Sequence, residues 1–403
     1  MALAGVRRGA AATAACGTVV ALLAGCGTST SHGTQPVGQT GAGVSPGTTT
    51  GSAKGEGMPA SGAPTSQSPA TADAKGTPAL PGGVVPVYPA WPTPIPPYTK
   101  SVDKWTAPMK AADAAGLKVW IETDLVKAWK AGPDKFAATV GQLGVEAQAD
   151  PGVVGFKIAD ELGQNPQSST TSPEEALRFL HDARAALHAA APGKLILIDV
   201  IGYDLGCVPG STADGRAKCL SDNAANDARL DLGTIDQIVG SGYVDALDVT
   251  TNMLRPEQYQ KNFKVTRAQA QQAAFAEIQR RGWDKKVIVN TRKALSWNTD
   301  TIPDAATAAA LVPDFIDVPV AAGAKAVDTW SFSQLYSKTG KPVYQLSPGY
   351  QTNPLWDALK AEKARGVQLF THYTPSYSLG TLGQDIAGIS QAFTGVFCAA
   401  GTG

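Results

Sequence analysis

The chain has 403 residues, of which 43% are hydrophobic and 17% charged, and its 34 basic and 34 acidic residues give a formal net charge of zero. A nucleic-acid-binding protein needs a basic stripe, and the sequence has none, so we expect no nucleic acid partner. Beyond a compositionally biased first segment, the remaining length suits one large α/β domain.

Residues 1–26 have the order of an export signal: Arg7 and Arg8, an apolar Ala-rich run, and the end Leu23-Ala24-Gly25-Cys26. This end resembles the lipobox of bacterial lipoproteins, whose cysteine is acylated after cleavage. The resemblance implies lipidation of Cys26 and a mature chain anchored to the extracytoplasmic face of the cell membrane by lipid alone. An ordinary secretory signal or a short membrane helix is the alternative.

Residues 27–83 consist mainly of Gly, Ser, Thr, Ala and Pro, with almost no large apolar side chain. Such a segment cannot bury enough surface to offset its chain entropy. We therefore expect a disordered tether that carries a folded domain at residues 84–403.

Eight short β-rich runs, separated by helical patterns, follow the tether. One helix is expected over 173–190, where Ser172 suits the N-cap and Pro173 the first turn. Alternation of strands and helices without a hairpin signal predicts a parallel sheet, and eight repeats favour a closed (β/α)₈ TIM barrel. The runs are Val84–Tyr88, Leu117–Glu122, Val153–Ala159, Leu195–Ile201, Val244–Thr250, Lys286–Asn290, Ala324–Trp330 and Val367–His372.

Side chains alternate between the two faces of a strand, so the polar residues of each run can be assigned to the barrel interior. The rule turns Trp120, Glu122 and Asp124 inward and groups Lys157 with Glu161. It also groups Asp248 with Thr250 and Asn252, Asn290 with Arg292, and Asp328 with Trp330. Because these polar residues come late in each run, we expect a polar pocket at the carboxyl end of the barrel, where active sites of this fold lie.

The segment Gly155-Phe-Lys-Ile-Ala-Asp160-Glu161 resembles the fourth strand of clan A glycoside hydrolases and related barrel families, which ends in Asn-Glu or Asp-Glu. Residues 116–122, 244–252 and 324–330 are similar to their third, sixth and eighth strands. The resemblance implies a glycoside hydrolase in which Glu161 matches the general acid/base.

Two features depart from that family. The Asp-Glu strand is only the third run, and Val367–His372 follows the equivalent of the eighth strand. We infer that Val367–His372 replaces the family's first strand, so that the barrel is circularly permuted and closed by its C-terminal strand. The seventh-strand equivalent, Lys286–Arg292, lacks the nucleophilic Glu, which puts the retaining mechanism in doubt.

Glycoside cleavage needs a protonated carboxylic acid and a second carboxylate across the bond. Glu161 is the candidate acid, and the alternative is a carboxylate that caps the loop or pairs with a Lys. An inward Lys157 would need an acidic partner, unless a local irregularity turns it to solvent. The other candidate catalytic carboxylates are Asp160, Asp124, Glu122, Asp248 and Asp328.

Aromatic and amide side chains near the strand ends suit a sugar subsite, because a pyranose has an apolar face and polar hydroxyls. The alternative is that they anchor core or loops, and that Arg292 makes a structural ion pair. The candidate substrate-binding residues are Tyr88, Trp91, Trp120, Tyr203, Asn252, Asn290, Arg292, Trp297, Trp330 and Gln334.

The cysteines and histidines give weaker signals. Cys207 and Cys219 lie close together in a loop-like segment, so an exported chain favours a disulfide between them, although a bridge from Cys398 to either is left open. His372 is expected near the mouth, but one imidazole is no metal signature, so we predict no metal site and no cofactor.

The leading hypothesis from the sequence is a lipid-anchored barrel that hydrolyses a cell-envelope or environmental polysaccharide, with Glu161 as the acid. One alternative is a non-catalytic carbohydrate-binding barrel that has lost its nucleophile. Another is the solute-binding lipoprotein of a transporter, which would have two open-sheet lobes.

Overall fold

Eight parallel strands form one closed barrel in a computed structural model of the chain. Around the ring the strands follow the order β1-β10-β9-β6-β5-β4-β3-β2, so β10 closes onto β1. The (β/α)₈ barrel predicted from the sequence is therefore confirmed. The structure describes residues 87–89, 91, 93–95, 103–165, 168–208, 213–226, 231–251, 256–291, 295, 302–335, 342–378 and 380–399.

The barrel strands are short and rich in Val, Ile and Leu, and helices cover their outer faces. A separate antiparallel pair, β7 (Ser333–Leu335) and β8 (Pro342–Gln345), lies outside the ring. The ring consists of β1 (Lys118–Glu122), β2 (Val153–Lys157), β3 (Leu195–Ile201), β4 (Ala246–Thr250), β5 (Val287–Asn290), β6 (Ala326–Thr329), β9 (Leu369–Tyr373) and β10 (Gly395–Ala399).

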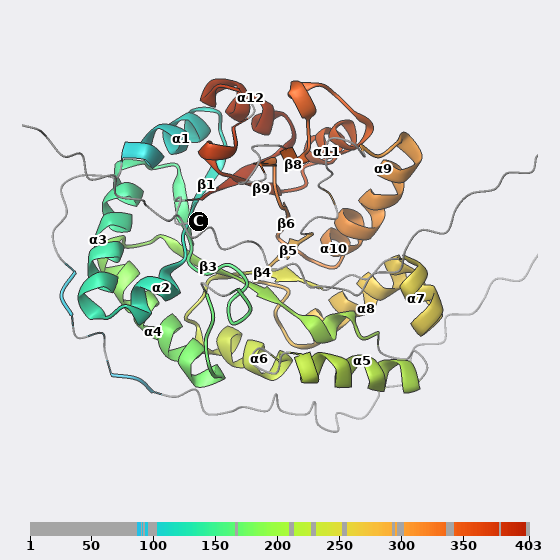
Figure 1. The fold of residues 1–403 in the computed structure, drawn as a ribbon, viewed down its shortest axis with the longest axis horizontal. Helices are drawn as coiled ribbons and strands as arrows, with labels where there is room; N and C mark the ends of the chain where they lie inside the picture. The colour runs from blue at the N-terminus through green and yellow to red at the C-terminus, as the bar shows by residue number, and fades with distance from the viewer. Residues whose placement is uncertain are drawn as a thin grey trace, which may run out of the picture. The chain divides into compact units, whose positions relative to one another are not determined.

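The helices surround the strands on the outside (Figure 1). The last described element is strand β10, and α1 packs against β1, β10 and α12. The helices are α1 (Asp103–Ala114), α2 (Leu125–Lys130), α3 (Pro133–Ala149), α4 (Pro173–Ala190), α5 (Ala213–Asn226), α6 (Leu232–Ser241), α7 (Pro256–Phe263), α8 (Arg267–Arg280), α9 (Ala305–Val312), α10 (Val318–Ala321), α11 (Pro354–Ala364) and α12 (Leu382–Ala392).

Helix α4 shows how the sequence sets the element boundaries. The Ser172 side chain accepts a hydrogen bond from the backbone N–H of Glu175, and Pro173 occupies the first turn. The Ser172 side chain satisfies a backbone N–H that has no partner within the helix. Pro173 has no N–H, so it leaves no unpaired donor in the first turn. The helix predicted over 173–190 is confirmed at both ends.

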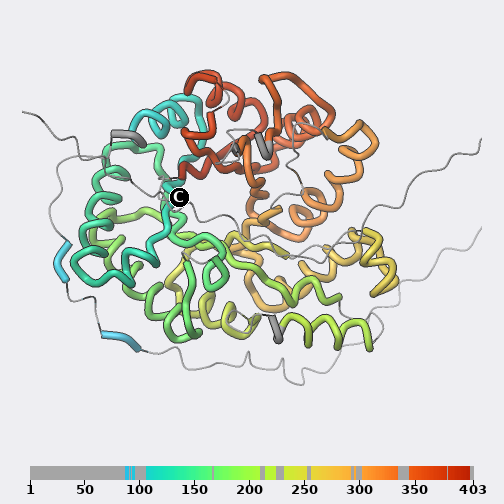
Figure 2. The backbone as a smooth tube through the Cα atoms, in the orientation of Figure 1, coloured from blue at the N-terminus to red at the C-terminus, as the bar shows by residue number. Residues whose placement is uncertain are grey.

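One of the eight predicted strands is wrong. Residues 87 and 88, the described part of Val84–Tyr88, form no strand, whereas Gly395–Ala399, which was not predicted, is β10. The C-terminal strand does close the barrel, but that strand is β10 and not Val367–His372, whose equivalent is β9. Around the ring the strands follow chain order from β1 to β10, so the colour of the backbone runs from cyan through green and yellow to red (Figure 2). The inferred permutation rested on the resemblance to glycoside hydrolases and falls with it.

The barrel interior has an apolar floor. Six buried side chains, one from each of six strands, make up this floor: Trp120, Leu197, Ile288, Ala326, Phe370 and Phe397. Two glycines make room for its largest rings. A Cβ on Gly155 would lie 2.6 Å from Trp120 Cζ3, and a Cβ on Gly395 would lie 2.6 Å from Phe370 Cδ1.

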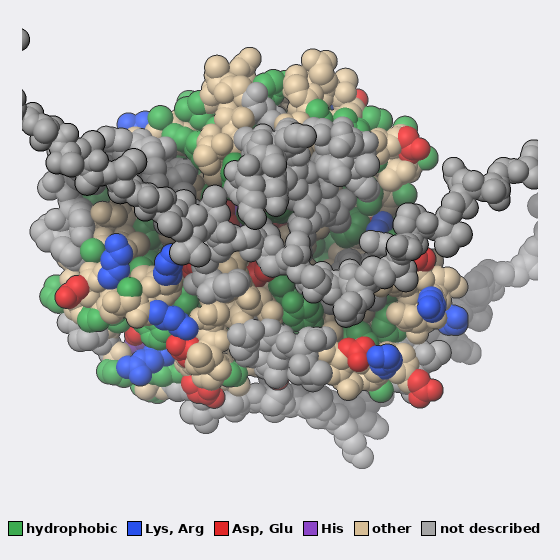
Figure 3. Space-filling model, in the orientation of Figure 1, with side chains coloured by type: hydrophobic (Ala, Val, Ile, Leu, Met, Phe, Trp, Pro, Cys, Tyr) green, Lys and Arg blue, Asp and Glu red, His purple; other side chains and the backbone are tan. Residues whose placement is uncertain are grey.

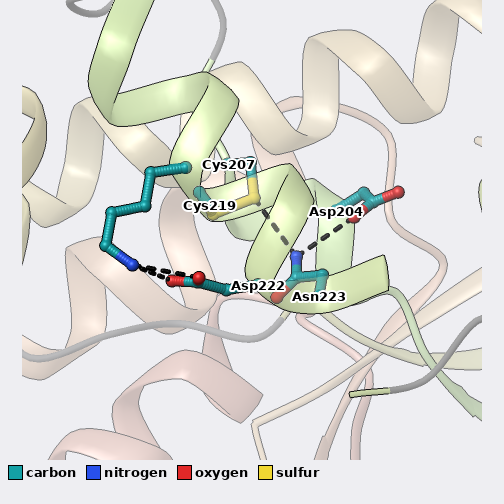
Figure 4. The surroundings of a disulfide bond; sticks show 6 residues. Asp204, Cys207, Cys219, Asp222 and Asn223 are labelled. Carbon is teal, nitrogen blue, oxygen red and sulfur yellow. Dashed lines mark hydrogen bonds and ion pairs between the residues drawn. A yellow bond between two sulfur atoms is a disulfide. The ribbon is translucent and has the colours of Figure 1, made fainter. Parts of the chain in front are cut away.

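The loop after β3 is cross-linked by a disulfide between Cys207 and Cys219, whose Cα atoms are 5.6 Å apart. Asn223 of α5 donates hydrogen bonds to Cys207 Sγ and to Asp204 Oδ1 (Figure 4). Cys398 is a free, buried cysteine on β10. The disulfide and these hydrogen bonds hold α5 against the turn that follows β3.

The predicted signal, the predicted lipidation site Cys26 and the predicted tether fall outside the described residues. Within the described part, no helix combines the length and the hydropathy needed to span a bilayer. On the face drawn in Figure 3, the described basic and acidic side chains are intermingled.

Candidate active site

A fully buried lysine lies above the apolar floor. Lys157 on β2 is 0% exposed, and its Nζ donates a hydrogen bond to Asp248 Oδ2 at 3.1 Å. The same Nζ is 3.5 Å from Asp199 Oδ2 and 3.6 Å from Glu122 Oε1. Three carboxylates from β1, β3 and β4 therefore surround one ammonium group, which is the acidic pairing that an inward Lys157 requires.

A buried histidine, His372, links two carboxylates next to the Lys157 ammonium group. His372 Nδ1 is 2.8 Å from Glu122 Oε2, and His372 Nε2 is 2.9 Å from Asp328 Oδ2. Asn290 Nδ2 donates to Asp199 Oδ2 and Asp248 Oδ2, each at 3.0 Å. We call the set Glu122, Lys157, Asp199, Asp248, Asn290, Asp328 and His372 the polar layer.

The strand register places several members of the polar layer side by side on neighbouring strands. Asp199 pairs with Asp248, Asn290 with Asp328, and Glu122 with Lys157 as Cα partners across neighbouring strands. Inward-facing residues at one height of a barrel form a layer. The period-two assignment of Glu122, Lys157, Asp248, Asn290 and Asp328 to the interior is therefore confirmed.

Burial and neighbouring charges shift the pKa values of the polar layer. Burial opposes both charged forms, but Asp248, Glu122 and Asp199 raise the pKa of Lys157, and Asp328 and Glu122 raise that of His372 to about 10. Burial, with Asp328 adding to it, raises the pKa of Asp248 to about 7. Burial also raises the pKa of Asp199, although Lys157 opposes this shift. The layer thus holds more carboxylates than its two basic groups neutralise.

Three carboxylate oxygens of the polar layer lack a hydrogen-bond partner among the described residues. They are Oδ1 of Asp199, Oδ1 of Asp248 and Oδ1 of Asp328. Asp248, Asp328 and His372 also offer ligand atoms that all lie within 4.8 Å of one another. These three residues form a group that could hold a metal ion.

Aromatic rings cover His372 from two sides. The Trp330 ring centroid lies 4.4 Å from that of His372, and the Phe397 centroid lies 5.0 Å away. Trp330 Nε1 donates a hydrogen bond to Gln334 Oε1. Trp330 and Gln334, two predicted site residues, thus belong to the immediate surroundings of the polar layer.

Asp124 and Asp160 form a second, smaller network. Ser168 Oγ donates to Asp124 Oδ1 at 2.9 Å and accepts from the backbone N–H of Asp160. Asn165 Nδ2 donates to Asp160 Oδ2. Glu161 lies in the turn after β2 with a positive φ of 47°, so the alternation of the strand no longer sets its direction. Glu161 and the partners of Asp160 belong to the loop that follows β2, and Asp124 belongs to the turn between β1 and α2, so none of them is part of the polar layer.

Replacing Asp124 with asparagine is expected to raise the free energy of unfolding by about 1 kcal/mol at about pH 7.5 and to leave it unchanged at about pH 4. Burial, together with the charge of Asp160, raises the pKa of Asp124 to about 6, against the hydrogen bond from Ser168. The folded state therefore binds this proton more tightly, and stability is lost as pH rises through the folded pKa. Urea unfolding of both proteins at the two pH values measures the difference, and an equal difference at both would contradict it.

The remaining predicted site residues lie apart from the polar layer or outside the described residues. Tyr88 stacks near His181 and donates to the Glu174 carbonyl, and Trp91 packs on Phe136 of α3, so both lie on the outer helices. Trp120 belongs to the apolar floor, and Tyr203 donates to Gln164. Asn252, Arg292 and Trp297 lie outside the described residues.

The sequence reading missed Asp199 and the role of His372. Asp199 is the one charged residue in the strand Leu195–Ile201, and period two places it on the face of Leu197. That single charge in an apolar run was the available signal. His372 was expected near the mouth, but its two carboxylate partners come from β1 and β6, far away in the sequence.

Comparison with known proteins gives neither a family nor a curated relative. No family model matches the chain, and no curated protein matches it. Among solved structures, a candidate phosphonomutase from Burkholderia cenocepacia J2315 is similar at 12% identity and a TM-score of 0.37, over 73% of this chain and 92% of that one. A 2,3-dimethylmalate lyase of the PEP mutase/isocitrate lyase superfamily has 12% identity and a TM-score of 0.34, over 72% and 79%.

A third similar structure is the carboxyl transferase domain of Rhizobium etli pyruvate carboxylase. It has 12% identity and a TM-score of 0.37, over 80% of this chain and 47% of that one. At this identity and these TM-scores, the likeness assigns no reaction to the chain.

The predicted membership of a clan A-like glycoside hydrolase family is wrong. None of these three similar structures is a glycoside hydrolase, and no family model matches. The geometry gives the physical reason, because Lys157 and His372 fill the space between the interior carboxylates where a glycosidic bond would have to lie.

The predictions that followed from this membership are corrected with it. These are the glycosidase activity with Glu161 as the acid, the carbohydrate partner, and the alternative of a non-catalytic carbohydrate-binding barrel. The solute-binding alternative needed two open-sheet lobes, and the single closed barrel contradicts it.

Proposed function

We propose that this chain is a barrel enzyme whose active centre is the polar layer and whose substrate is a small polar molecule. The observation that carries the proposal is the meeting of six ionisable side chains, each from a different strand, at the carboxyl end of a closed parallel barrel. They are Glu122, Lys157, Asp199, Asp248, Asp328 and His372. In barrels of this fold, the carboxyl end carries catalysis and the other end carries stability.

The cost of the cluster supports a functional role. Burying charges costs several kcal/mol per ion, and well-packed apolar residues in their place are often as stable or more stable. The floor just below is apolar, so the same strands can fill the barrel with Leu197, Ile288 and Phe370. The barrel could therefore be closed by a second apolar layer, and its stability does not require the ionic one.

The burial of the polar layer indicates the size of the substrate. Glu122 is the most exposed of the six ionisable groups at 8%, and Lys157, Asp248 and Asp328 are 0% exposed. A molecule that contacts these groups must enter the barrel, which suits a compact metabolite and not a polymer lying across the surface. Its polar groups would donate the hydrogen bonds that the three unpartnered carboxylate oxygens lack.

A panel of small polar metabolites tests the proposal. Nuclear magnetic resonance of the His372 imidazole reports binding, and mass spectrometry of the same mixtures reports turnover. We expect at least one compound to shift the His372 signals but not those of His181 on α4, and its turnover to be lost in Asp199→Asn. Asp199 contacts Lys157 and Asn290, so its carboxylate matters to the layer as a whole.

Asp385→Asn is the matched control, because Asp385 is a fully buried carboxylate that Tyr350 and Tyr373 hold away from the polar layer. It should keep turnover. If no compound shifts the His372 signals and none is turned over, the polar layer is a structural ion network and the proposal is wrong.

We also propose, from the sequence alone, that Cys26 carries the lipid that anchors the mature chain outside the cell membrane. Cys26→Ser in the full chain should release the protein from the membrane fraction into the medium. Unchanged membrane association of Cys26→Ser would contradict the proposed anchor.

A further inference from the structure

We propose that Asp248, Asp328 and His372 bind one divalent metal ion within the polar layer. This proposal deepens the proposed function, since it names what the same site would use to bind its substrate. The three residues come from β4, β6 and β9 and are 0%, 0% and 1% exposed.

The ligand atoms lie nearly close enough to share an ion. Their mutual distances are within 4.8 Å. A metal ion about 2.1 Å from each nitrogen or oxygen ligand needs ligands no more than about 4.2 Å apart. Bringing every pair of ligand atoms inside this limit would take side-chain shifts of about 0.6 Å or less.

Unpartnered oxygens point to a missing cation independently of these distances. Asp248 Oδ2 contacts Lys157 and Asn290, and Asp328 Oδ2 contacts His372. The second oxygen of each carboxylate, Oδ1, is buried and has no partner among the described residues. A buried carboxylate oxygen without a donor costs free energy, and a metal ion would remove that cost.

The hydrogen bonding of His372 suits a metal ligand. Metal-binding histidines usually donate their second ring N–H to a carboxylate, which fixes the tautomer and the orientation of the ring. Glu122 Oε2 lies 2.8 Å from His372 Nδ1 and fills that role, while Nε2 faces Asp328. The rings of Trp330 and Phe397 both pack against that of His372.

Charge balance favours the same conclusion. Four carboxylates, Glu122, Asp199, Asp248 and Asp328, face the Lys157 ammonium and one imidazole. A metal-bound His372 is neutral, so four ionised carboxylates and the Lys157 ammonium leave three negative charges in a buried site, of which a divalent ion would balance two. Lys157 Nζ contacts Asp248 through Oδ2 and not Oδ1, but it also lies 3.4 Å from His372 Nε2. Metal binding at Nε2 therefore requires the ammonium group to shift toward Glu122 and Asp199, which it already contacts.

The ligand types select the class of ion. Carboxylates suit Mg²⁺, Ca²⁺ and Mn²⁺, and imidazole suits Zn²⁺, Cu²⁺, Fe²⁺ and Ni²⁺, so two carboxylates with one imidazole fit Mn²⁺ or Zn²⁺. Such an ion would bind an oxygen atom of a small anionic or carbonyl-containing substrate directly.

The test measures metal binding without any substrate. The full mature chain is stripped with a chelator, dialysed against Mn²⁺ or Zn²⁺ and analysed by elemental mass spectrometry and calorimetry. We expect one ion per chain, and binding weakened by at least about tenfold in both Asp328→Asn and His372→Gln. Asp385→Asn and His181→Gln, which change a buried carboxylate and a histidine elsewhere, should bind like the wild type.

A measurement on the wild-type chain guards against variants that fail to fold. Pulsed electron paramagnetic resonance of bound Mn²⁺ should show coupling to an imidazole nitrogen, and His181→Gln should keep it. No ion retained from either metal solution would overturn the proposal, as would binding that both ligand variants leave unchanged. Because this readout needs no turnover, a metal-free polar layer that still turns over a metabolite would refute the metal site alone.

Discussion

Replacing Lys157 with methionine is expected to lower the free energy of unfolding by about 3–5 kcal/mol, because removing one partner of a buried ion pair leaves the other charges uncompensated. Methionine has a similar length and no charge. Glu122, Asp199 and Asp248 would then face one another across the barrel without the ammonium group that lies between them. Urea unfolding of the variant and the wild type at neutral pH measures the loss.

Lys118→Met is the matched control for this experiment. Lys118 lies on the neighbouring strand β1, but its Nζ binds the Gln368 side chain at the exposed end of the barrel. Its replacement should cost no more than about 0.5 kcal/mol. Adding Asp248→Asn to Lys157→Met should recover part of the loss. If Lys157→Met were as stable as Lys118→Met, the charge of Lys157 would not be what holds the polar layer together.

Replacing Gly155 with alanine is expected to lower the free energy of unfolding by about 2–3 kcal/mol, because an extra methyl group would overpack the barrel floor. The new Cβ would collide with the Leu195 carbonyl oxygen and lie 2.6 Å from Trp120 Cζ3. The carbonyl belongs to the neighbouring strand, so neither obstacle can move freely. Urea unfolding again measures the change.

The same substitution at Gly240 should have the opposite sign. Gly240 lies in helix α6, and nothing is within 4 Å of the Cβ that alanine would add. Gly240→Ala should therefore raise the free energy of unfolding by about 0.5–1 kcal/mol. Equal effects at the two glycines would mean that the barrel floor is not tightly packed around Gly155.

The fold and half of the site could be read from local patterns. Alternating strands and helices gave the barrel, and the period of two gave the inward direction of Glu122, Lys157, Asp248 and Asp328. Local reading failed where the strand ended, because the turn at Glu161 has a positive φ and breaks the alternation. Asp160 lies just beyond the end of β2 and Asp124 just beyond the end of β1, and both join the loop network with Ser168.

The chain's own sequence determined which residues face the barrel interior, because side-chain direction along a strand is a local property of the backbone. Only the tertiary structure decided which of these side chains contact one another. Glu122 of β1 and His372 of β9 are 250 residues apart in the sequence, yet Glu122 Oε2 lies 2.8 Å from His372 Nδ1. Ring closure and strand register set those partners, and both depend on the packing of the whole barrel. For that reason a pair of adjacent acids suggested a glycosidase, whereas the folded chain holds a lysine and a histidine among four carboxylates.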